Sequence, residues 1–160
     1  MFTIGKKILS AISLLFAATL FLSCDGSKIY RNIDDFEDNR WAKTDVRTFE
    51  FDIPAEGDYN LTVLFSHVYD TPLSNIPLVI KIETPDGKSE IINIIMHIRD
   101  EDGKQLADCG GDYCDFEQAI FRNRKLAEGP YKISVSNTFD YEYMPNVIGI
   151  GISVNKSELK

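Results

Sequence analysis

Residues 76–98 read IPLVIKIETPDGKSEIINIIMHI, and this stretch decides the fold of the chain. Apolar side chains alternate with other residues in Ile76–Glu83 and again, less regularly, in Glu90–Ile98. Alternation with a period of two, in runs rich in β-branched residues, predicts strands that bury one face. The pair Asp86-Gly87 between the runs suits the positive backbone angles of a tight turn, so the stretch predicts a β-hairpin.

Four further runs show the same alternation, with aromatic or β-branched residues on one face: 48–53, 59–66, 131–136 and 148–154. Residues 116–126 fit either a strand or a short helix. Gly149 and Gly151 in the last run indicate a bulge or a close approach of two backbones. No helices alternate with the strands, which argues against a parallel α/β sheet. The sequence therefore predicts an all-β fold, an antiparallel β-sandwich of about 7–8 strands with a jelly-roll or immunoglobulin-like topology.

The beginning of the chain has the pattern of an export signal. Lys6-Lys7 gives a basic start, an apolar run covers 8–20, and the small residue Ser23 precedes Cys24. This order is typical of a bacterial lipoprotein signal, in which cleavage falls before the cysteine and its thiol takes a diacylglyceryl group. An uncleaved anchor or an ordinary signal peptide is the alternative, but the apolar run is short for a spanning helix. We expect three parts: a cleaved signal peptide at 1–23, a lipidated tether at 24–40 and a single β-sandwich domain at 41–160.

The part that would remain after cleavage is acidic. The chain has 17 Lys+Arg and 25 Asp+Glu, and two lysines lie in the signal, which leaves 15 against 25, a net charge of −10. Such a domain has little to neutralise phosphates, which argues against nucleic-acid binding and against an electrostatic membrane patch. We expect a protein held on the outer membrane by the lipid at Cys24, on the periplasmic face, with other envelope proteins as partners.

Two cysteines remain after acylation of Cys24. Cys109 and Cys114 enclose four residues, two of them glycines, so the short loop between them can close. An exported protein meets an oxidising compartment, which favours a disulfide between them, with two free thiols or a metal site as alternatives. Zinc would need four ligands, and only His67 and His97, both inside strand-like runs, could add to the cysteines.

No motif of an active site is present. The chain has no Gly-x-Ser-x-Gly nucleophile turn and no phosphate-binding glycine loop. Acids that gather around three glycines could offer oxygen ligands to calcium: Asp100, Glu101, Asp102, Asp108, Asp112 and Asp115. Because Gly103 comes too early for the helix-loop-helix calcium pattern, two solvated acidic turns are the simpler interpretation. We therefore expect no enzyme, no catalytic residue, no metal and no cofactor.

Aromatic residues in loops are the candidates for contact with a partner or ligand. Tyr141 and Tyr143 flank an acid just before a proline, and Tyr113 follows a pair of glycines. Aromatic platforms on sandwich loops can meet a peptide or a glycan. Trp41 could join such a platform, but a side chain of this size is more often well buried, so we expect it in the core.

The order of short motifs along the chain resembles the GldH family of gliding motility lipoproteins of the Bacteroidetes. The motifs that carry the resemblance follow Cys24 in this order: Tyr30, Trp41, Asp45-Val46, Phe49-x-Phe51-x-Ile53-Pro54, Tyr59-Asn-Leu61, Pro72-Leu-Ser-Asn75-Ile76, Asp102-Gly103, Gly111-Asp112, Glu128-Gly-Pro-Tyr131 and Ile148-Gly149. The resemblance implies an outer-membrane lipoprotein that supports the envelope machinery of gliding and, in association, of protein secretion. It implies no enzyme activity and no catalytic residues.

Three functional hypotheses follow. The first is a non-enzymatic, lipid-anchored accessory or assembly component of gliding motility or associated secretion machinery. The second is a glycan-binding outer-membrane lipoprotein. The third, an envelope hydrolase, has no residue that can be named for it.

Overall fold

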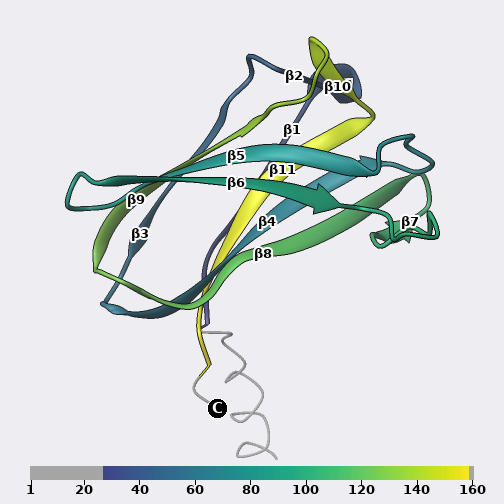
Figure 1. The fold of residues 1–160 in the computed structure, drawn as a ribbon. Coiled ribbons are helices and arrows are strands. Elements are labelled where there is room, and N and C mark those ends of the chain that lie inside the picture. Colours follow the sequence, from purple (N-terminus) through teal and green to yellow (C-terminus); the bar gives the residue numbers. More distant parts are fainter. Residues whose placement is uncertain (1–26, 159–160) are drawn as a thin grey trace, which may run out of the picture.

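The computed structural model describes residues 27–158, and most of these residues lie in strands (Figure 1). Eight strands are long: β1 (Lys28–Asp35), β3 (Arg47–Ile53), β4 (Gly57–Val68), β5 (Asn75–Glu83), β6 (Ser89–His97), β8 (Tyr113–Leu126), β9 (Gly129–Asn137) and β11 (Val147–Lys156). Three strands have three residues each: β2 (Arg40–Ala42), β7 (Asp108–Gly110) and β10 (Tyr143–Pro145). A short 3-10 turn, η2, spans Glu37–Asn39.

The strands form two main antiparallel sheets and a small third one. The first sheet has the order β1-β11-β4-β8-β7, the second has the order β3-β9-β5-β6, and β10 pairs with β2 (Figure 1). This arrangement confirms the predicted all-β antiparallel sandwich. The eight long strands match the predicted number, and the three short ones are additional because three residues are too few to show alternation.

The predicted hairpin is the pair β5–β6. Its strands pair from Asn75 opposite His97 to Glu83 opposite Ser89, and Gly87 takes a positive φ of 77° in the turn. The two glycines of β11 also behave as predicted. The register against β4 shifts between Val147 and Gly149, as at a bulge, and Gly151 lies against the backbone of β1.

The predicted tether at 24–40 is too long. Residues Lys28–Asp35 form β1, which pairs antiparallel with β11 at the edge of the first sheet. Phe36 follows as a core residue, and its N–H donates to the carbonyl of Ile148. Sequence alternation is weak here because an edge strand buries only part of one face. The sandwich therefore begins before residue 41, and only residues that precede Lys28 can act as a tether.

Residues 116–126, which fitted either a strand or a helix, belong to β8. This strand pairs with β4 along its length, with two register shifts near Tyr59 and Leu61. Phe116, Ile120 and Phe121 pack against the core but remain half-buried. A strand that is partly exposed on both faces shows little alternation, which explains the ambiguity of its sequence.

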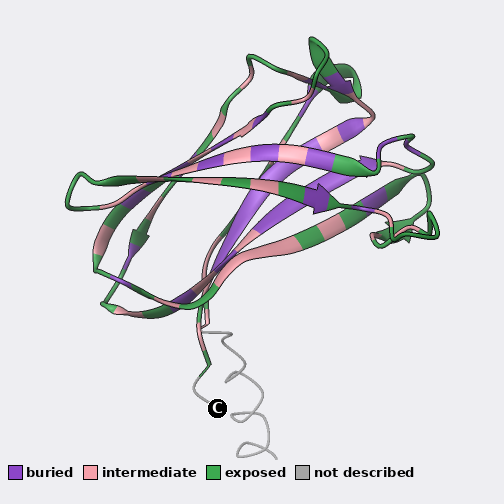
Figure 2. Ribbon diagram, in the orientation of Figure 1, coloured by how far each residue is buried: buried purple, intermediate pink, exposed green. Residues whose placement is uncertain are grey.

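The core lies between the two main sheets. Figure 2 shows buried residues along β4, β5 and β11, while exposed residues gather at β7 and at the turns. The largest fully buried side chains include Trp41, Tyr59, Phe49 and Phe65, so Trp41 lies in the core as predicted. Within the described part of the chain, no helix is long and apolar enough to cross a membrane.

Candidate partner-binding surface

The sandwich has two ends with different character. At one end the chain enters at Ser27, whose carbonyl accepts a 2.6 Å hydrogen bond from the Lys156 N–H near the end of β11. At the opposite end lie the small sheet β2–β10 and the loop between β9 and β10 (Figure 1). The two ends hold two different hollows, one apolar and one polar.

The end far from Ser27 carries an apolar hollow of about 580 Å³. We call the residues that line it the distal surface: Pro72, Leu73, Phe139, Tyr141, Glu142, Tyr143 and Pro145. Tyr141 is 72% exposed and Tyr143 is 41% exposed. The rings of Phe139 and Tyr141 lie 5.5 Å apart, and the Arg40 guanidinium lies 5.0 Å from the ring centre of Tyr143. The structure thus brings two of the three predicted contact tyrosines into one surface.

A rigid base supports this surface. Met144 lies between Tyr143 and Pro145 in the sequence. It is fully buried and pairs with Trp41 across β10–β2. The Trp41 indole stacks on Phe36 at 5.1 Å, and its N–H donates to the carbonyl of Asp45 at 2.8 Å. Because Trp41 and Met144 are buried in the core, Tyr143 extends from a strand that the core supports rather than from a loop.

Tyr113, the third predicted tyrosine, lies at the same end but does not line the hollow. It begins β8 beside the β7–β8 turn and pairs with Val68, whose N–H donates to the carbonyl of Asn146. Tyr69 comes next to it, with its N–H donating to the carbonyl of Asp112. Both tyrosines are about half exposed. Neither residue lines the hollow of the distal surface.

Cys109 and Cys114 are joined by a disulfide that closes the β7–β8 turn. The two residues are direct partners in the antiparallel register, with their Cα atoms 4.0 Å apart. Cys114 is fully buried and Cys109 is exposed. The bond therefore fastens a short exposed strand to the edge of β8, and it favours the disulfide over the free thiols and the metal site left open by the sequence.

Two of the acidic residues between positions 100 and 115, Asp100 and Asp115, accept hydrogen bonds from neighbouring groups of the protein. The Asp100 carboxylate accepts hydrogen bonds from the N–H groups of Asp102 and Lys104, and Asp115 accepts one from the Ser66 hydroxyl. Among residues 27–158, no three His, Cys, Asp or Glu side chains come together as metal ligands would. The sequence cluster is spread over two turns and the two strands β7 and β8.

The two histidines lie in strands but in opposite environments. His67 on β4 is fully buried, with Nδ1 2.9 Å from the carbonyl of Val68. Burial lowers the pKa of His67 below its ordinary 6.5, and the nearby Arg99 acts in the same direction. His97 on β6 is exposed and its Nδ1 lies 2.7 Å from the Asn75 side-chain oxygen. Both histidines therefore lie in strands, as their sequence runs predicted, but only His67 is buried.

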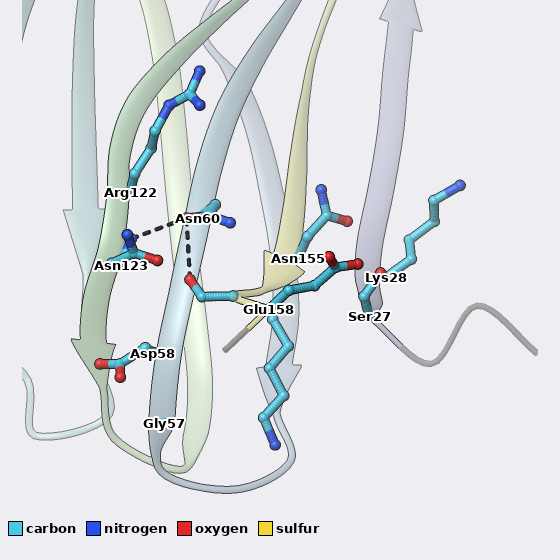
Figure 3. A pocket seen from close by; sticks show the side chains of 11 residues that line it. Ser27, Lys28, Gly57, Asp58, Asn60, Arg122, Asn123, Asn155 and Glu158 are labelled. Carbon is cyan, nitrogen blue, oxygen red and sulfur yellow. Dashed lines mark hydrogen bonds between the residues drawn. The ribbon is translucent and has the colours of Figure 1, made fainter. Parts of the chain in front are cut away.

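A polar hollow of about 1050 Å³ lies at the end where the chain enters, and Figure 3 shows the side chains that line it. Asn60 organises it, because its side-chain oxygen accepts from the Asn123 N–H at 2.9 Å and from the Ser157 hydroxyl at 3.1 Å. Lys28, Arg122 and Lys156 bring positive charge, and Asp58 and Glu158 bring negative charge. The sequence does not reveal this hollow, because its residues come mainly from β1, β4, β8 and β11 and meet only in the folded sheet.

Comparison with known proteins identifies the family. The sequence pattern of the GldH lipoprotein family matches residues 28–154. The chain is also 26% identical over 127 residues to the gliding motility lipoprotein GldH of Flavobacterium johnsoniae, which covers 76% of each chain. Two solved structures show a remote likeness at 12% identity. The first is Eiger TNF from S. frugiperda, with a TM-score of 0.42; the match covers 84% of this chain and 96% of the other. The second is TmCBM61 in complex with beta-1,4-galactotriose, with a TM-score of 0.37; the match covers 82% of this chain and 92% of the other.

Both TM-scores are below 0.5, so these structural likenesses carry no argument about function. The family match, by contrast, spans the sandwich from β1 to β11. It confirms the resemblance seen in the order of the sequence motifs. The chain belongs to the GldH lipoprotein family.

Proposed function

We propose that this protein is a non-enzymatic, lipid-anchored accessory component of gliding motility or associated secretion machinery, held on the periplasmic face of the outer membrane. Membership of the GldH lipoprotein family supports the cell-envelope role. The observation that carries the proposal is the position of the distal surface, at the end of the sandwich opposite to Ser27 (Figure 1). In this proposal one end meets the membrane and the other meets a protein.

The membrane end follows from the lipid at Cys24, which lies outside the described residues. Two residues separate Cys24 from Ser27, and this step of three positions along the chain spans at most roughly 10 Å. Because β1 begins directly afterwards, the domain has little freedom to move away from the bilayer. Two or more acyl chains on Cys24 would make the attachment stable, whereas one chain alone is marginal.

The partner end follows from the length and chemistry of the sandwich. β4 has 12 residues, which span roughly 40 Å at the usual rise of a strand. The distal surface is thereby held well clear of the headgroups. Its exposed tyrosines join a large apolar area to a polar tip, a combination that is enriched in protein interfaces. Glu142 between them supplies an acidic group for orientation.

Crosslinking in intact cells tests the proposal. A tagged full-length chain would be crosslinked and purified together with three variants: the double variant Tyr141→Ala, Tyr143→Ala; the matched control Tyr113→Ala; and Cys24→Ala. We expect other envelope lipoproteins or motor and secretion components with the parent chain and with Tyr113→Ala, and their loss with the double variant. Retention of the same partners by the double variant would show that the distal surface is not the contact. Cys24→Ala should leave the membrane fraction, and a variant that still sediments with membranes as the parent does would refute the lipid anchor.

Glycan binding is the second candidate, because exposed tyrosines beside a hollow can also stack on sugar rings. It predicts that a polysaccharide raises the melting temperature of the parent chain but not that of the Tyr141→Ala, Tyr143→Ala variant. Tryptophan fluorescence is a poor reporter here, since Trp41 is fully buried beneath the surface. No shift across a broad glycan panel would remove this candidate.

A further inference from the structure

The free edges of the two main sheets differ in how they are protected. Strand edges invite pairing with other strands, and proteins usually guard them with charged residues, prolines or covering segments. β1, β3 and the uncovered part of β8 all carry charges, among them Arg31, Glu50 and Glu117. β6 forms the end of the second sheet. Its one Asp or Glu, Glu90, forms an ion pair with Arg124 of β8 near the start of the strand, and residues 91–96 contain no charged residue and no proline. β6 is therefore the least protected of these edges.

The backbone of β6 has hydrogen-bonding groups directed outward. The Ile98 N–H donates to the carbonyl of Ser74, and the Thr84 N–H donates to the carbonyl of Lys88, so the even-numbered residues bond toward β5. Antiparallel strands alternate the direction of these groups from one residue to the next. Ile91, Asn93 and Ile95 therefore direct N–H and C=O groups to the free edge. Within residues 27–158 no strand pairs with β6 on that side.

The side chains of β6 are unusually apolar for an edge strand. Ile91 is 62% exposed and Ile95 is 54% exposed, both on the outer face of the sheet. Beside them on β5, Pro77 pairs with Ile95 and Val79 pairs with Asn93. On the inner face, Ile92 and Ile94 pack against the core but stay half-buried. Both faces of this edge would lose exposed apolar surface if another strand were added.

The sequence at this edge is symmetric. Residues 91–95 read Ile-Ile-Asn-Ile-Ile, the same in both directions. We propose that two copies of this protein associate by antiparallel pairing of their β6 strands around a two-fold axis at Asn93. Ile91 then lies opposite Ile95 of the second copy, Ile92 opposite Ile94, and Asn93 opposite Asn93. A two-fold interface requires a surface that is complementary to itself, and this segment meets that requirement residue by residue.

The register is specified by the polar residue at the centre. Pairing at Asn93 brings the two amide side chains together on the outer face, where they can bond to each other. A shift of the pairing by two residues would keep the same side chains on the outer face of the sheet. It would place Asn93 opposite Ile91 or Ile95 of the second copy, so that the amide would face an isoleucine. Outside the symmetric segment, Glu90 faces Met96 and Ser89 faces His97, so no like charges oppose each other.

The pairing adds main-chain bonds and is compatible with two membrane-attached copies. The outward-directed pairs at residues 91, 93 and 95 would each exchange two backbone hydrogen bonds, joining the two β3-β9-β5-β6 sheets into one. In Figure 1, β6 runs across the view, whereas β1, the strand that follows Ser27, rises from the lower part of the sandwich. Antiparallel pairing of strands that lie across this direction does not force the two Ser27 ends to point away from each other.

Cysteine crosslinking of the full-length lipidated chain in intact cells tests the proposal. Directly opposite residues in a hydrogen-bonded pair have Cα atoms about 5.5 Å apart, within the range of a disulfide. Asn93→Cys should therefore give a covalent homodimer under mild oxidation. We expect no covalent homodimer from Ile91→Cys alone or from Ile95→Cys alone. Cells that contain both variants, with tags of different size, should give a covalent dimer of one variant with the other. Glu50→Cys, on another edge of the same sheet, is the matched control and should stay monomeric.

Three results would overturn the proposal. One is an Asn93→Cys chain that stays monomeric while the mixed Ile91→Cys and Ile95→Cys population gives no dimer. Another is equal dimer yield from Glu50→Cys or from Ile91→Cys alone, which would indicate random collision. The third is a crosslink to a different protein instead of a second copy.

A charge placed on this edge gives an independent measurement. Adding Ile91→Lys to Asn93→Cys should lower the dimer yield about tenfold, because each lysine would face Ile95 of the second copy. Val46→Lys, which replaces another half-exposed aliphatic residue outside β6, should leave the yield unchanged. Equal yields from the two lysine variants would contradict pairing through β6.

Discussion

A Cβ atom on Gly151 would lie 2.1 Å from the carbonyl oxygen of Asn32, which is far inside van der Waals contact. Gly151 is in β11 and Asn32 in the edge strand β1, so the absence of a side chain lets the two strands pair. β1 is also the first strand of the described residues. The close pairing of β1 with β11 at this position thus depends on the absence of a side chain at residue 151.

Gly151→Ala should therefore destabilise the sandwich. Forcing an extra carbon into a packed site costs about 1–3 kcal/mol, and here the obstacle is backbone rather than a flexible side chain. Urea unfolding of the Cys24→Ala form would measure the loss of free energy. Gly110→Ala is the matched control, because a Cβ at Gly110 meets no atom within 4 Å. Equal unfolding midpoints for the two variants would contradict the close approach of β1 and β11.

Trp41 should emit fluorescence typical of an apolar environment. The chain has one tryptophan, and its side chain is fully buried against Phe36. We expect a blue-shifted emission maximum in the folded protein and little quenching by iodide. Trp41→Phe should cost about 1–3 kcal/mol of unfolding free energy, because the Asp45 carbonyl loses its indole donor. Strong iodide quenching of the native protein would place the indole outside the core.

Loss of the disulfide should weaken the protein without unfolding it. Cys109 and Cys114 enclose a very short loop, for which the chain-entropy estimate is about 2 kcal/mol. The replacement of both by alanine should lower the unfolding free energy by about this amount and increase proteolysis in the β7–β8 turn. Since the bond lies away from the lining of the distal surface, crosslinking to partners should persist. A complete loss of folding would show that the bond supports more than its own turn.

Acid should destabilise the protein through His67. Burial lowers the pKa of this imidazole below 6.5, so the unfolded chain takes up a proton near pH 6.5 while the folded chain does so only at lower pH. The neutral His67 contributes fully to the free energy of unfolding above pH 6.5. This contribution is lost as the pH falls toward the pKa of the folded state, and the free energy of unfolding decreases by at most about 1.4 kcal/mol per pH unit. Comparing unfolding free energies at about pH 7.5 and 5.5 should show a larger drop for the parent chain than for His67→Gln. Identical drops would mean that His67 is not buried in its neutral form.

The main strands could be predicted from the sequence because each of them buries one face. The hairpin of β5 and β6 is the clearest case, since alternation and the Asp86-Gly87 turn agree. β1 escaped prediction because it is an edge strand with charged residues, and β2, β7 and β10 escaped because they are too short for a pattern. The sequence also could not separate a strand from a helix in β8, whose residues are partly exposed on both faces.

The candidate site was predictable only in part. Tyr141 and Tyr143 were found because loop aromatics before a proline are normally exposed. Their neighbour Leu73 comes from the loop after β4, about seventy residues earlier, and only the fold brings it to the same hollow. Tyr113 was grouped with them by residue type alone, and the fold sets it apart. Likewise, the residues around Asn60 in the sequence do not predict its hydrogen bonds to Asn123 and Ser157.

The hydrogen bond between Ser27 and Lys156 sets both described ends of the chain at one pole of the domain. In the orientation proposed above, a purification tag or fluorescent protein fused after the last residue would be attached at the membrane-proximal pole and would leave the opposite pole unobstructed. Probes meant to report on that pole would instead have to be inserted in a loop there, such as the one around Asp140. The opposite pole holds neither end of the described residues 27–158, so loops there can lengthen or change sequence without disturbing the proposed attachment.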